Sequence, residues 1–479
     1  MQRTRWFQSV FRPTDARLSM PSVLILVLAV SLVGGLLVSL LGGLISLGLL
    51  AGMTLGLWVL RDIDVGYVAL IAVICLLPFG ALPVNVGFKP TFLDLIVGAL
   101  FFVWLMQRVT GKLGRFAAVP IGVPVLIFLA LALASFVAGL GHAPLTQTVA
   151  RHFAEVLLSI MLFFMVVDTV RDEARLAKFV RAIMIAGFLA SLIAIVLYIL
   201  PDGTTMELLS RLRVFGYPEG PGVLRYIRDD PSLTQRATGT AVDPNVLGGL
   251  LIMTLSVSAA QVFGSRPVVR RGWAAIIAAA MATALVLTIS RGSFVGAGAA
   301  LLGLSVLRYR KIMPILAVAV IFILILPQTQ AYVTHFFEGV QGEDLATQMR
   351  FGEYRDALTL IGRYPIFGVG FTGAPDLDTY LGVANVYLTI AQQMGMVGLA
   401  AFLLAMLTLF AWSWRARRAV RDRPALEPMW WGLHAAIAGA LVGGIFDHYF
   451  FNLDFHHSVA FFWLFAGLAA GATRLASNQ

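Results

Sequence analysis

The sequence has a single cysteine and few charged residues. Cys75 is the one cysteine among 479 residues, which excludes internal disulfides and cysteine-based metal sites. Charged residues make up 13% of the chain, about half the share found in an ordinary soluble domain. The sequence also has no Gly-x-x-x-x-Gly-Lys motif, the loop that binds nucleotide phosphates. We therefore expect neither a soluble globular domain nor a reaction driven by nucleotide hydrolysis.

The chain is instead strongly apolar. Hydrophobic residues make up 59% of it, and the mean hydropathy is +0.87. A transmembrane helix needs about 20 consecutive apolar residues. These features predict an all-α polytopic integral membrane protein with about 14 (12–14) transmembrane helices. The expected spans are 22–40, 42–60, 65–80, 91–107, 119–139, 153–169, 178–200, 244–264, 273–289, 292–307, 311–327, 386–412, 429–446 and 457–473.

Two polar stretches interrupt the apolar runs. The longer one, at 328–385, lies between two apolar runs and contains a Pro-x-x-Gly-x-Gly turn signal. A membrane protein that keeps so long a polar insert on one face is expected to use it, so we place the working surface there. The expected division is a cytoplasmic segment at 1–20, a membrane domain at 21–327 with an outer loop at 201–243, the large outer loop at 328–385, and C-terminal membrane helices at 386–479.

Lysine and arginine set the expected orientation, because they are enriched in cytoplasmic loops. With the N-terminus in the cytoplasm, alternation of the spans places both termini and most of the 35 basic residues inside. The net charge of +10 is then mostly a signal of topology, and nucleic-acid binding is the weaker interpretation. The basic residues that face outward against this bias are Lys89, Arg151, Arg211, Arg213, Arg225, Arg228, Arg236, Arg291, Arg350, Arg355 and Arg363.

The outward basic residues are almost all arginines. A guanidinium group keeps its charge at any working pH and presents a planar fork that suits phosphate and carboxylate. These arginines therefore predict an anionic ligand at the outer surface. The alternative is that they pair with outward acids such as Asp229, Asp230, Glu353 and Asp356, and both interpretations stay open.

Arg291 stands apart from the others, in the sequence TISRGSFVGAG between two apolar runs. A charge at such a position is costly and indicates a functional site, although a snorkelling side chain would also explain it. Arg151 and Glu155 lie four residues apart on one helix face, which favours a local ion pair. Asp94 and Asp243 are each expected to stabilise the start of a helix.

Three histidines crowd the last outer loop, in DHYFFNLDFHHS. His456 and His457 lie there near Asp447 and Asp454. Histidine and carboxylate side chains together bind metals or supply a general base. Because the spacing matches no metal motif, we expect no metal site. A hydrogen-bonded loop histidine is the alternative to a base.

Four motifs in the second half of the chain resemble those of a known family. In order, they are RATGTAVDPNVLGGLL at 236–251, LTISRGSFVGA at 287–297, GRYPIFGVGF at 362–371 and ANVYLTIAQQMGMVGLAAF at 384–402. Motifs of these forms, in this order and with a large outer loop before the last, are similar to those of the O-antigen ligase and polymerase family. The resemblance implies a membrane glycosyltransferase with a GT-C-like fold.

The resemblance also implies a reaction. Members of the family move a glycan from an undecaprenyl pyrophosphate carrier to an acceptor at the periplasmic face of the bacterial inner membrane. The expected chemistry is metal-independent inversion without a cofactor. The implied partners are the lipid-linked glycan, the acceptor glycan, membrane lipids, a flippase and a chain-length regulator, with no nucleic acid.

One position departs from the ligases of that family. They usually carry a histidine before the asparagine of the fourth motif, whereas this chain has Ala384 before Asn385. We therefore expect a polymerase of surface polysaccharide, such as O-antigen, capsule or exopolysaccharide. Ligation of the glycan to lipid A core is the alternative.

Particular residues take implied roles. Arg291 would stabilise the negative charge on the departing pyrophosphate. The other catalytic candidates, which would accept the proton of the acceptor hydroxyl, are Glu353, His456 and His457. The candidates for substrate binding are Arg236, Arg350, Arg355, Asn245, Asn385, Tyr387 and Arg151.

A transporter of lipid-linked oligosaccharides is the alternative from another functional class. A transporter is expected to hold charged residues near the middle of the bilayer, on broken helices. Here almost all outward charges lie at the ends of the apolar runs. This distribution favours chemistry at the outer surface.

Overall fold

A computed structural model of the chain describes residues 61–83, 88–325, 345–373 and 382–477, together with single positions between 54 and 59. The chain divides into two units, Met1–Arg61 and Asp62–Gln479. The expected cytoplasmic segment at 1–20 and the apolar run at 22–40 lie outside the described residues, as does most of the run at 42–60. The second unit holds almost everything that the structure describes.

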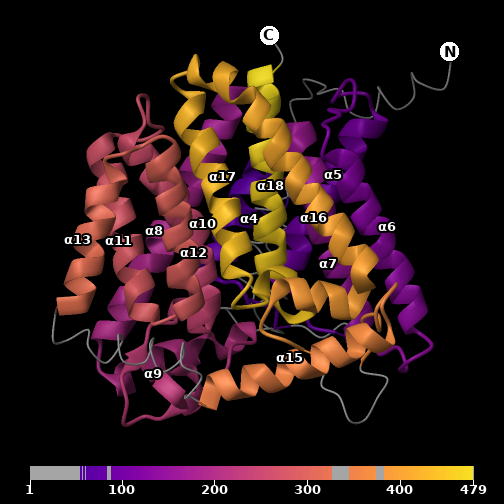
Figure 1. The fold of residues 1–479 in the computed structure, drawn as a ribbon, viewed down its shortest axis with the longest axis vertical. Helices are drawn as coiled ribbons and strands as arrows, with labels where there is room; N and C mark the ends of the chain where they lie inside the picture. The colour runs from indigo at the N-terminus through magenta and orange to yellow at the C-terminus, as the bar shows by residue number, and fades with distance from the viewer. Residues whose placement is uncertain are drawn as a thin grey trace, which may run out of the picture. The chain divides into compact units, whose positions relative to one another are not determined.

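The second unit is mostly helical (Figure 1). Each apolar run expected after residue 60 corresponds to one helix. Among the described residues, 8 helices are long and apolar enough to cross a membrane, as expected for an all-α polytopic membrane protein. The helices of these runs are α4 (Ile63–Leu76), α5 (Phe92–Val109), α6 (Gly122–Gly139), α7 (Gln147–Thr169), α8 (Glu173–Ile199), α10 (Pro244–Phe263), α11 (Arg271–Thr288), α12 (Arg291–Leu307), α13 (Ile312–Ile325), α16 (Val386–Arg421), α17 (Leu426–Gly443) and α18 (His456–Ser477).

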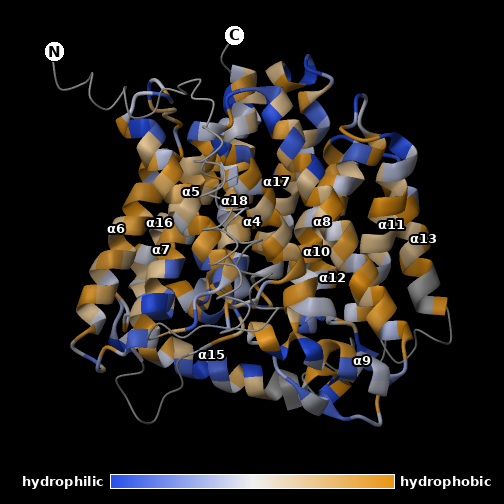
Figure 2. Ribbon diagram, turned by 180° about the vertical axis from the view of Figure 1, so that it is seen from behind, coloured by the Kyte–Doolittle hydropathy of each residue, from blue (hydrophilic) through white to orange (hydrophobic). Residues whose placement is uncertain are grey.

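Helices α10 and α18 form the centre of this unit. Helix α17 packs against both of them, and α18 also packs along α7. In each of the two central helices, 89% of the apolar window is buried. Both are apolar on every side and contain small residues, so neighbouring helices approach them from all directions. Figure 2 shows the polar residues gathering at the two ends of the helices, with an apolar band between.

Glycines set the close contacts that matter for the site. A methyl group on Gly296 of α12 would lie 2.8 Å from the carbonyl oxygen of Gly439 in α17. A methyl group on Gly249 of α10 would lie 2.2 Å from the ring of Tyr449, which follows α17. The absence of side chains at these glycines lets α12 pack closely on α17 and brings the start of α10 beside the segment that follows α17.

The outer loop at 201–243 is folded rather than irregular. It begins with helix α9 (Asp202–Ser210), continues through short 3-10 turns, and contains a two-stranded antiparallel ribbon of β1 (Arg225–Tyr226) and β2 (Gln235–Arg236). In the ribbon, Arg225 lies opposite Arg236. The ribbon is the sole departure from helix among the named elements of the described residues.

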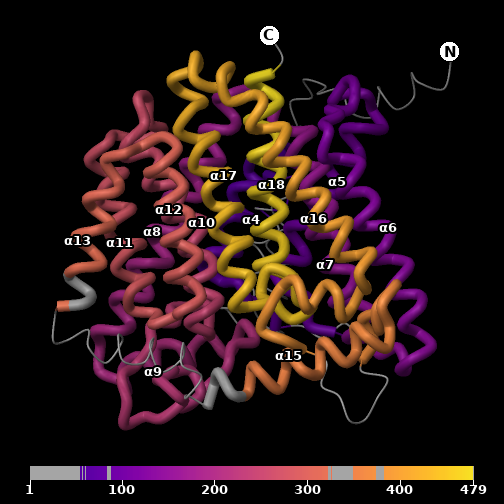
Figure 3. Tube along the Cα trace, in the orientation of Figure 1, coloured from indigo at the N-terminus to yellow at the C-terminus, as the bar shows by residue number. Residues whose placement is uncertain are grey.

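The expected large outer loop at 328–385 contains a helix, α15 (Leu345–Arg363). The charge of this segment drew attention to it, and its helical period indicates the helix. Ala357 and Leu360 of α15 are buried and Tyr354 and Ile361 are half-buried, at the spacing of one helix face. Figure 3 shows α15 running across the ends of the bundle helices, near the start of α16.

Helix α16 is broken at Gly395, whose φ of 67° and ψ of −174° are not helical. The break leaves the carbonyl oxygens of Gln392 and Gln393 without partners in the helix. The Pro-x-x-Gly-x-Gly segment supplies the hydrogen-bond donors instead. The Val369 amide donates to the carbonyl oxygen of Gln392 at 2.9 Å, and the Gly370 amide donates to that of Gln393 at 3.0 Å. The expected role of these glycines in a tight turn with close helix packing is confirmed.

Candidate functional site

The candidate site lies where five segments meet at one end of the bundle. These are β2 with the turn before α10, the junction between α11 and α12, helix α15, the residue before α16, and the segment between α17 and α18. The contacts below tie each segment to at least one other. Together they bring three of the arginines that we expect to face outward to one region of the molecule.

Arg236 joins two of these segments. Its Nε donates to the carbonyl oxygen of Thr288 at 2.9 Å, and its Nη2 donates to Oδ1 of Asn245 at 2.7 Å. Burial lowers the pKa of Arg236 to about 10, and the carboxylates of Asp243 and Asp447 oppose this change. The side chain therefore remains charged at neutral pH. Its two acceptors carry no charge, so they orient the guanidinium group without neutralising it.

Arg291 is the first residue of α12 and is half-buried. Its charge contributes to lowering the pKa of Arg236, so the two guanidinium groups act on one another. The N-terminal turn of α12 adds the positive end of a helix dipole at the same place. Ser290 precedes Arg291, and its hydroxyl lies 2.9 Å from that of Ser293. Positive charge is thus concentrated where α12 begins.

The backbone is strained just before α10 and just before α12. Val242 has φ of 62° and Ile289 has φ of 50°, a region that β-branched residues rarely adopt. Val242 precedes Asp243, whose Oδ1 accepts hydrogen bonds from the amides of Asn245 and Val246 at 2.7 and 3.2 Å. The expected capping role of Asp243 is confirmed. Strain of this kind is typical of functional sites, where surrounding structure holds an unfavourable conformation in place.

The sequence named Asp447 only as a neighbour of His456 and His457 and not as a catalytic candidate. It is buried, and its Oδ1 accepts a hydrogen bond from the His448 amide at 2.8 Å. Burial raises the pKa of its carboxyl, interactions with His448 and Arg350 lower it, and the carboxylate of Asp243 raises it. A carboxylate just after an apolar run, beside a loop rich in histidine, was the signal that would have found it.

Arg350 and Glu353 bring α15 to the site. The charge of Arg350 acts on Asp447, which places the two groups in one electrostatic environment. Glu353 accepts a hydrogen bond at Oε2 from the Ala384 amide at 3.1 Å. This bond holds the residue that stands where ligases have histidine. Arg355, in contrast, lies on the exposed face of α15.

Asn385 and Tyr387 fix the start of α16. Asn385 accepts a hydrogen bond from the Leu388 amide at 3.0 Å, and its Nδ2 donates to the carbonyl oxygen of Ile445 at 2.9 Å. The Tyr387 hydroxyl donates to the carbonyl oxygen of Leu441 at 2.7 Å. Both side chains therefore connect α16 to the end of α17, which positions the segment that carries Asp447.

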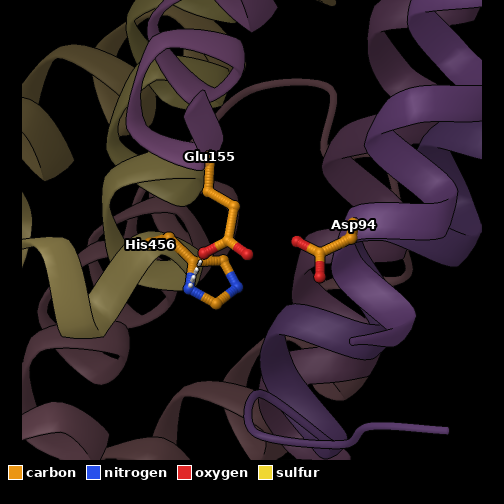
Figure 4. A group of neighbouring side chains, drawn as sticks. All are labelled: Asp94, Glu155 and His456. Atoms are coloured by element: carbon orange, nitrogen blue, oxygen red, sulfur yellow. Dashed lines mark ion pairs between the residues drawn. The ribbon is translucent and has the colours of Figure 1, made fainter. Parts of the chain in front are cut away.

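The remaining candidates lie in a second group, around the side chains of Asp94, Glu155 and His456 that Figure 4 shows. Arg151 donates from Nε to Glu155 Oε1 at 2.6 Å and from Nη2 to Asp94 Oδ2 at 3.1 Å. His456 Nδ1 lies 3.2 Å from Glu155 Oε2. The expected ion pair between Arg151 and Glu155 is confirmed, and it extends to α5 and α18. Asp94 also forms a capping box with Thr91 at the start of α5, as expected.

This second group contains atoms that lie close enough for one metal ion. The ligand atoms of Asp94, Glu155 and His456 lie within 4.8 Å of one another, beside a cavity of about 170 Å³. Arg151 binds both carboxylates and supplies one positive charge to the pair. His457 is buried next to it, with its ring 4.7 Å from that of Phe79 in an edge-on contact.

Residues 276–403 match a family model described as O-antigen ligase. None of the curated proteins compared matches the chain. The matched stretch runs from within α11 to within α16. It contains four residues of the candidate site described first: Arg291, Arg350, Glu353 and Asn385. This match over residues 276–403 confirms the resemblance that the sequence motifs indicated.

Proposed function

We propose that this chain is a bacterial surface polysaccharide polymerase. It transfers a glycan from undecaprenyl pyrophosphate to an acceptor sugar hydroxyl at the periplasmic face of the inner membrane, with both of its termini in the cytoplasm. The observation that carries the proposal is the convergence of Arg236, Arg291 and Arg350 with the buried carboxyl of Asp447 in and beside the stretch that matches the O-antigen ligase family model.

The arginines match the needs of the leaving group. When the bond between the anomeric carbon and the phosphate oxygen breaks, negative charge develops on a lipid-linked pyrophosphate. The Arg236 guanidinium, which neutral acceptors hold, and the Arg291 side chain at the N-terminus of α12 would stabilise that charge with little reorganisation. They supply positive charge from the chain itself, so the proposed transfer is metal-independent and uses no cofactor.

Asp447 is suited to accept the proton of the acceptor hydroxyl. In an inverting displacement, the acceptor oxygen forms a bond to the anomeric carbon as the pyrophosphate leaves from the opposite face, and the hydroxyl proton passes to a base. A carboxylate with a raised pKa is a stronger base than an ordinary carboxylate. Glu353 and His456 remain candidates, but Glu353 is engaged by the Ala384 amide.

Polymerisation is favoured over ligation by position 384. The alanine there presents no side chain to an acceptor, whereas ligases of the family usually carry histidine. Ligation to lipid A core is the second candidate. A flippase and a chain-length regulator are the further partners that a polymerase would need.

The test uses the full chain purified in detergent, with undecaprenyl-pyrophosphate-linked repeat units and without nucleotide. A ladder of lengthening glycans is the expected product. Transfer that occurs only when lipid A core is added would show a ligase. Transport of the lipid-linked glycan across a vesicle membrane, without transfer to either acceptor, would contradict the proposal and favour a transporter.

A further inference from the structure

A second basic region lies at the opposite end of the bundle from the candidate site. Helix α12 begins at Arg291 and ends at Leu307, α16 begins beside Asn385 and ends at Arg421, and α17 runs back from Leu426. The ends away from the candidate site enclose a cavity of about 370 Å³. Its lining includes Arg308, Trp414, Arg417, Arg418, Arg421 and Glu427.

We propose that this cavity binds the head group of an anionic phospholipid that carries two phosphates. The cavity has four guanidinium groups and one carboxylate. Glu427 is buried and forms an ion pair with Arg308, so these two charges balance one another. The charges of the other three arginines remain uncompensated by acids among the described residues. A head group with two phosphates carries negative charge of similar size to the positive charge of these three arginines.

The arginines differ in how firmly they are held. Arg417 donates to the carbonyl oxygen of Trp414 at 2.6 Å, and its guanidinium lies 4.3 Å from the centre of the Trp414 ring. Arg418 and Arg421 are exposed. Among the described residues, neither side chain has a hydrogen-bond or ion-pair partner. The cavity thus combines fixed charges at its wall with arginines that are free to close on a phosphate.

Exposed apolar side chains beside these charges point to a lipid rather than a soluble phosphate compound. Trp414 is 47% exposed and Leu307 is 52% exposed. Tryptophan and arginine at the ends of membrane helices lie at the level of the lipid head groups. Basic pockets between such helices bind anionic phospholipids, with acyl chains against the apolar surface below. The binding does not depend on the reaction proposed for the other end.

The experiment measures binding of a fluorescent diphosphatidylglycerol to the full chain in detergent. The double variant Arg418→Ser/Arg421→Ser is expected to bind at least about tenfold more weakly, the loss expected for two arginine contacts with phosphate. Arg415→Ser is the matched control, since Arg415 is an exposed arginine of α16 outside the lining, and it should bind as the unchanged chain does. Arg418→Lys/Arg421→Lys should retain most of the affinity.

Competition identifies the ligand. Unlabelled diphosphatidylglycerol is expected to displace the probe, and phosphatidylcholine is not. Equal binding by the Arg418→Ser/Arg421→Ser variant, or equal displacement by phosphatidylcholine, would overturn the proposal. Displacement by inorganic pyrophosphate at the same concentration as the lipid would also overturn it, because the cavity would then be a site for a soluble anion.

Discussion

The outward arginines separate into two kinds according to what already holds them. Arg211 pairs with Glu207 at 2.6 Å and Arg213 with Glu219 at 3.0 Å, so each charge has an acid beside it. Arg236 is held by a carbonyl and an amide oxygen. Neutral acceptors orient a guanidinium group and leave its charge available to a ligand. The sequence shows the charge of an arginine, but its neighbours decide whether that charge is available.

Replacement of Arg291 tests the central assignment. Arg291→Ala is expected to lower glycan transfer by about 10²–10³-fold or more, because a group that stabilises charge in the transition state is lost. Arg291→Lys should restore little activity if the arginine binds two phosphate oxygens through its fork. Transfer is measured on the purified variants with the lipid-linked substrate.

The control for this substitution is Arg211→Ala, since Arg211 is an exposed arginine of the same set that pairs with Glu207 and is not a site candidate. It should transfer glycan at close to the full rate. Both variants should insert into the membrane and elute as a single species. Full activity in a well-folded Arg291→Ala protein would remove the assignment of this arginine to the leaving group.

Asp447 predicts a specific pH dependence. Its carboxyl must be ionised to accept a proton, and burial raises its pKa. Transfer should therefore rise with pH through a pKa above the usual value of about 3.9 for aspartate. Asp447→Asn should lower kcat by about 10²–10⁴-fold and remove this acidic limb from the pH profile.

A structural role for Asp447 would give a different result. The variant would then lose stability, and the residual activity would keep the pH profile of the unchanged chain. Glu353→Gln serves as a comparison, because the amide oxygen of glutamine still accepts the bond from Ala384. If Glu353→Gln and not Asp447→Asn removes the acidic limb, Glu353 is the base.

At the scale of the element, α16 depends on the glycine at its break. A methyl group on Gly395 would lie 1.9 Å from the carbonyl oxygen of Ile366, which is far inside contact distance. The φ of 67° would also strain any residue with a side chain. Gly395→Ala is expected to destabilise the protein by more than the about 1–3 kcal/mol of backbone strain alone, because the clash adds to it.

The measurement is thermal unfolding in detergent, with Gly352→Ala of α15 as the control. No heavy atom lies within 4 Å of a methyl group at Gly352, so alanine there should be neutral or slightly stabilising. Glycan transfer should fall in Gly395→Ala, since Asn385 at the start of α16 is tied to the segment that leads to Asp447. Unchanged unfolding temperatures for both variants would disprove the argument.

At the scale of the whole molecule, Arg151 ties three helices together. It binds Glu155 of α7 and Asp94 of α5, and Glu155 in turn lies beside His456 of α18. Arg151→Met would leave the two carboxylates in a largely buried place without their cation. The expected loss of unfolding free energy is at the low end of the about 3–5 kcal/mol for breaking a buried ion pair.

The comparison is Arg211→Met, which removes an exposed ion pair that contributes at most about 1 kcal/mol. Thermal unfolding distinguishes the two variants. The sequence proposed that Arg151 binds substrate. If Arg151→Met loses transfer while its stability is unchanged, that role is correct and the structural one is wrong.

The sequence by itself determined that this is a helical membrane protein, because apolar runs of sufficient length have no other stable form in a bilayer. It also predicted Arg291 as a site residue, since a charge between two apolar runs is rarely tolerated without use. The capping role of Asp243 and the turn at Gly368 and Gly370 were predicted as well, because these depend on neighbours close in sequence.

Only the tertiary structure decided which residues share a site. Asp447 and Arg236 are far apart in the sequence, and the pattern of neither segment indicates that they meet. The same holds for Arg151 with Asp94, which α5 and α7 bring together. Long-range packing sets these distances, and close contacts at glycines such as Gly249 and Gly296 depend on the shapes of both partners. The hydropathy of a segment indicates that it crosses the membrane, but it does not indicate which helices are its neighbours. The grouping of the arginines could therefore be seen only in the tertiary structure.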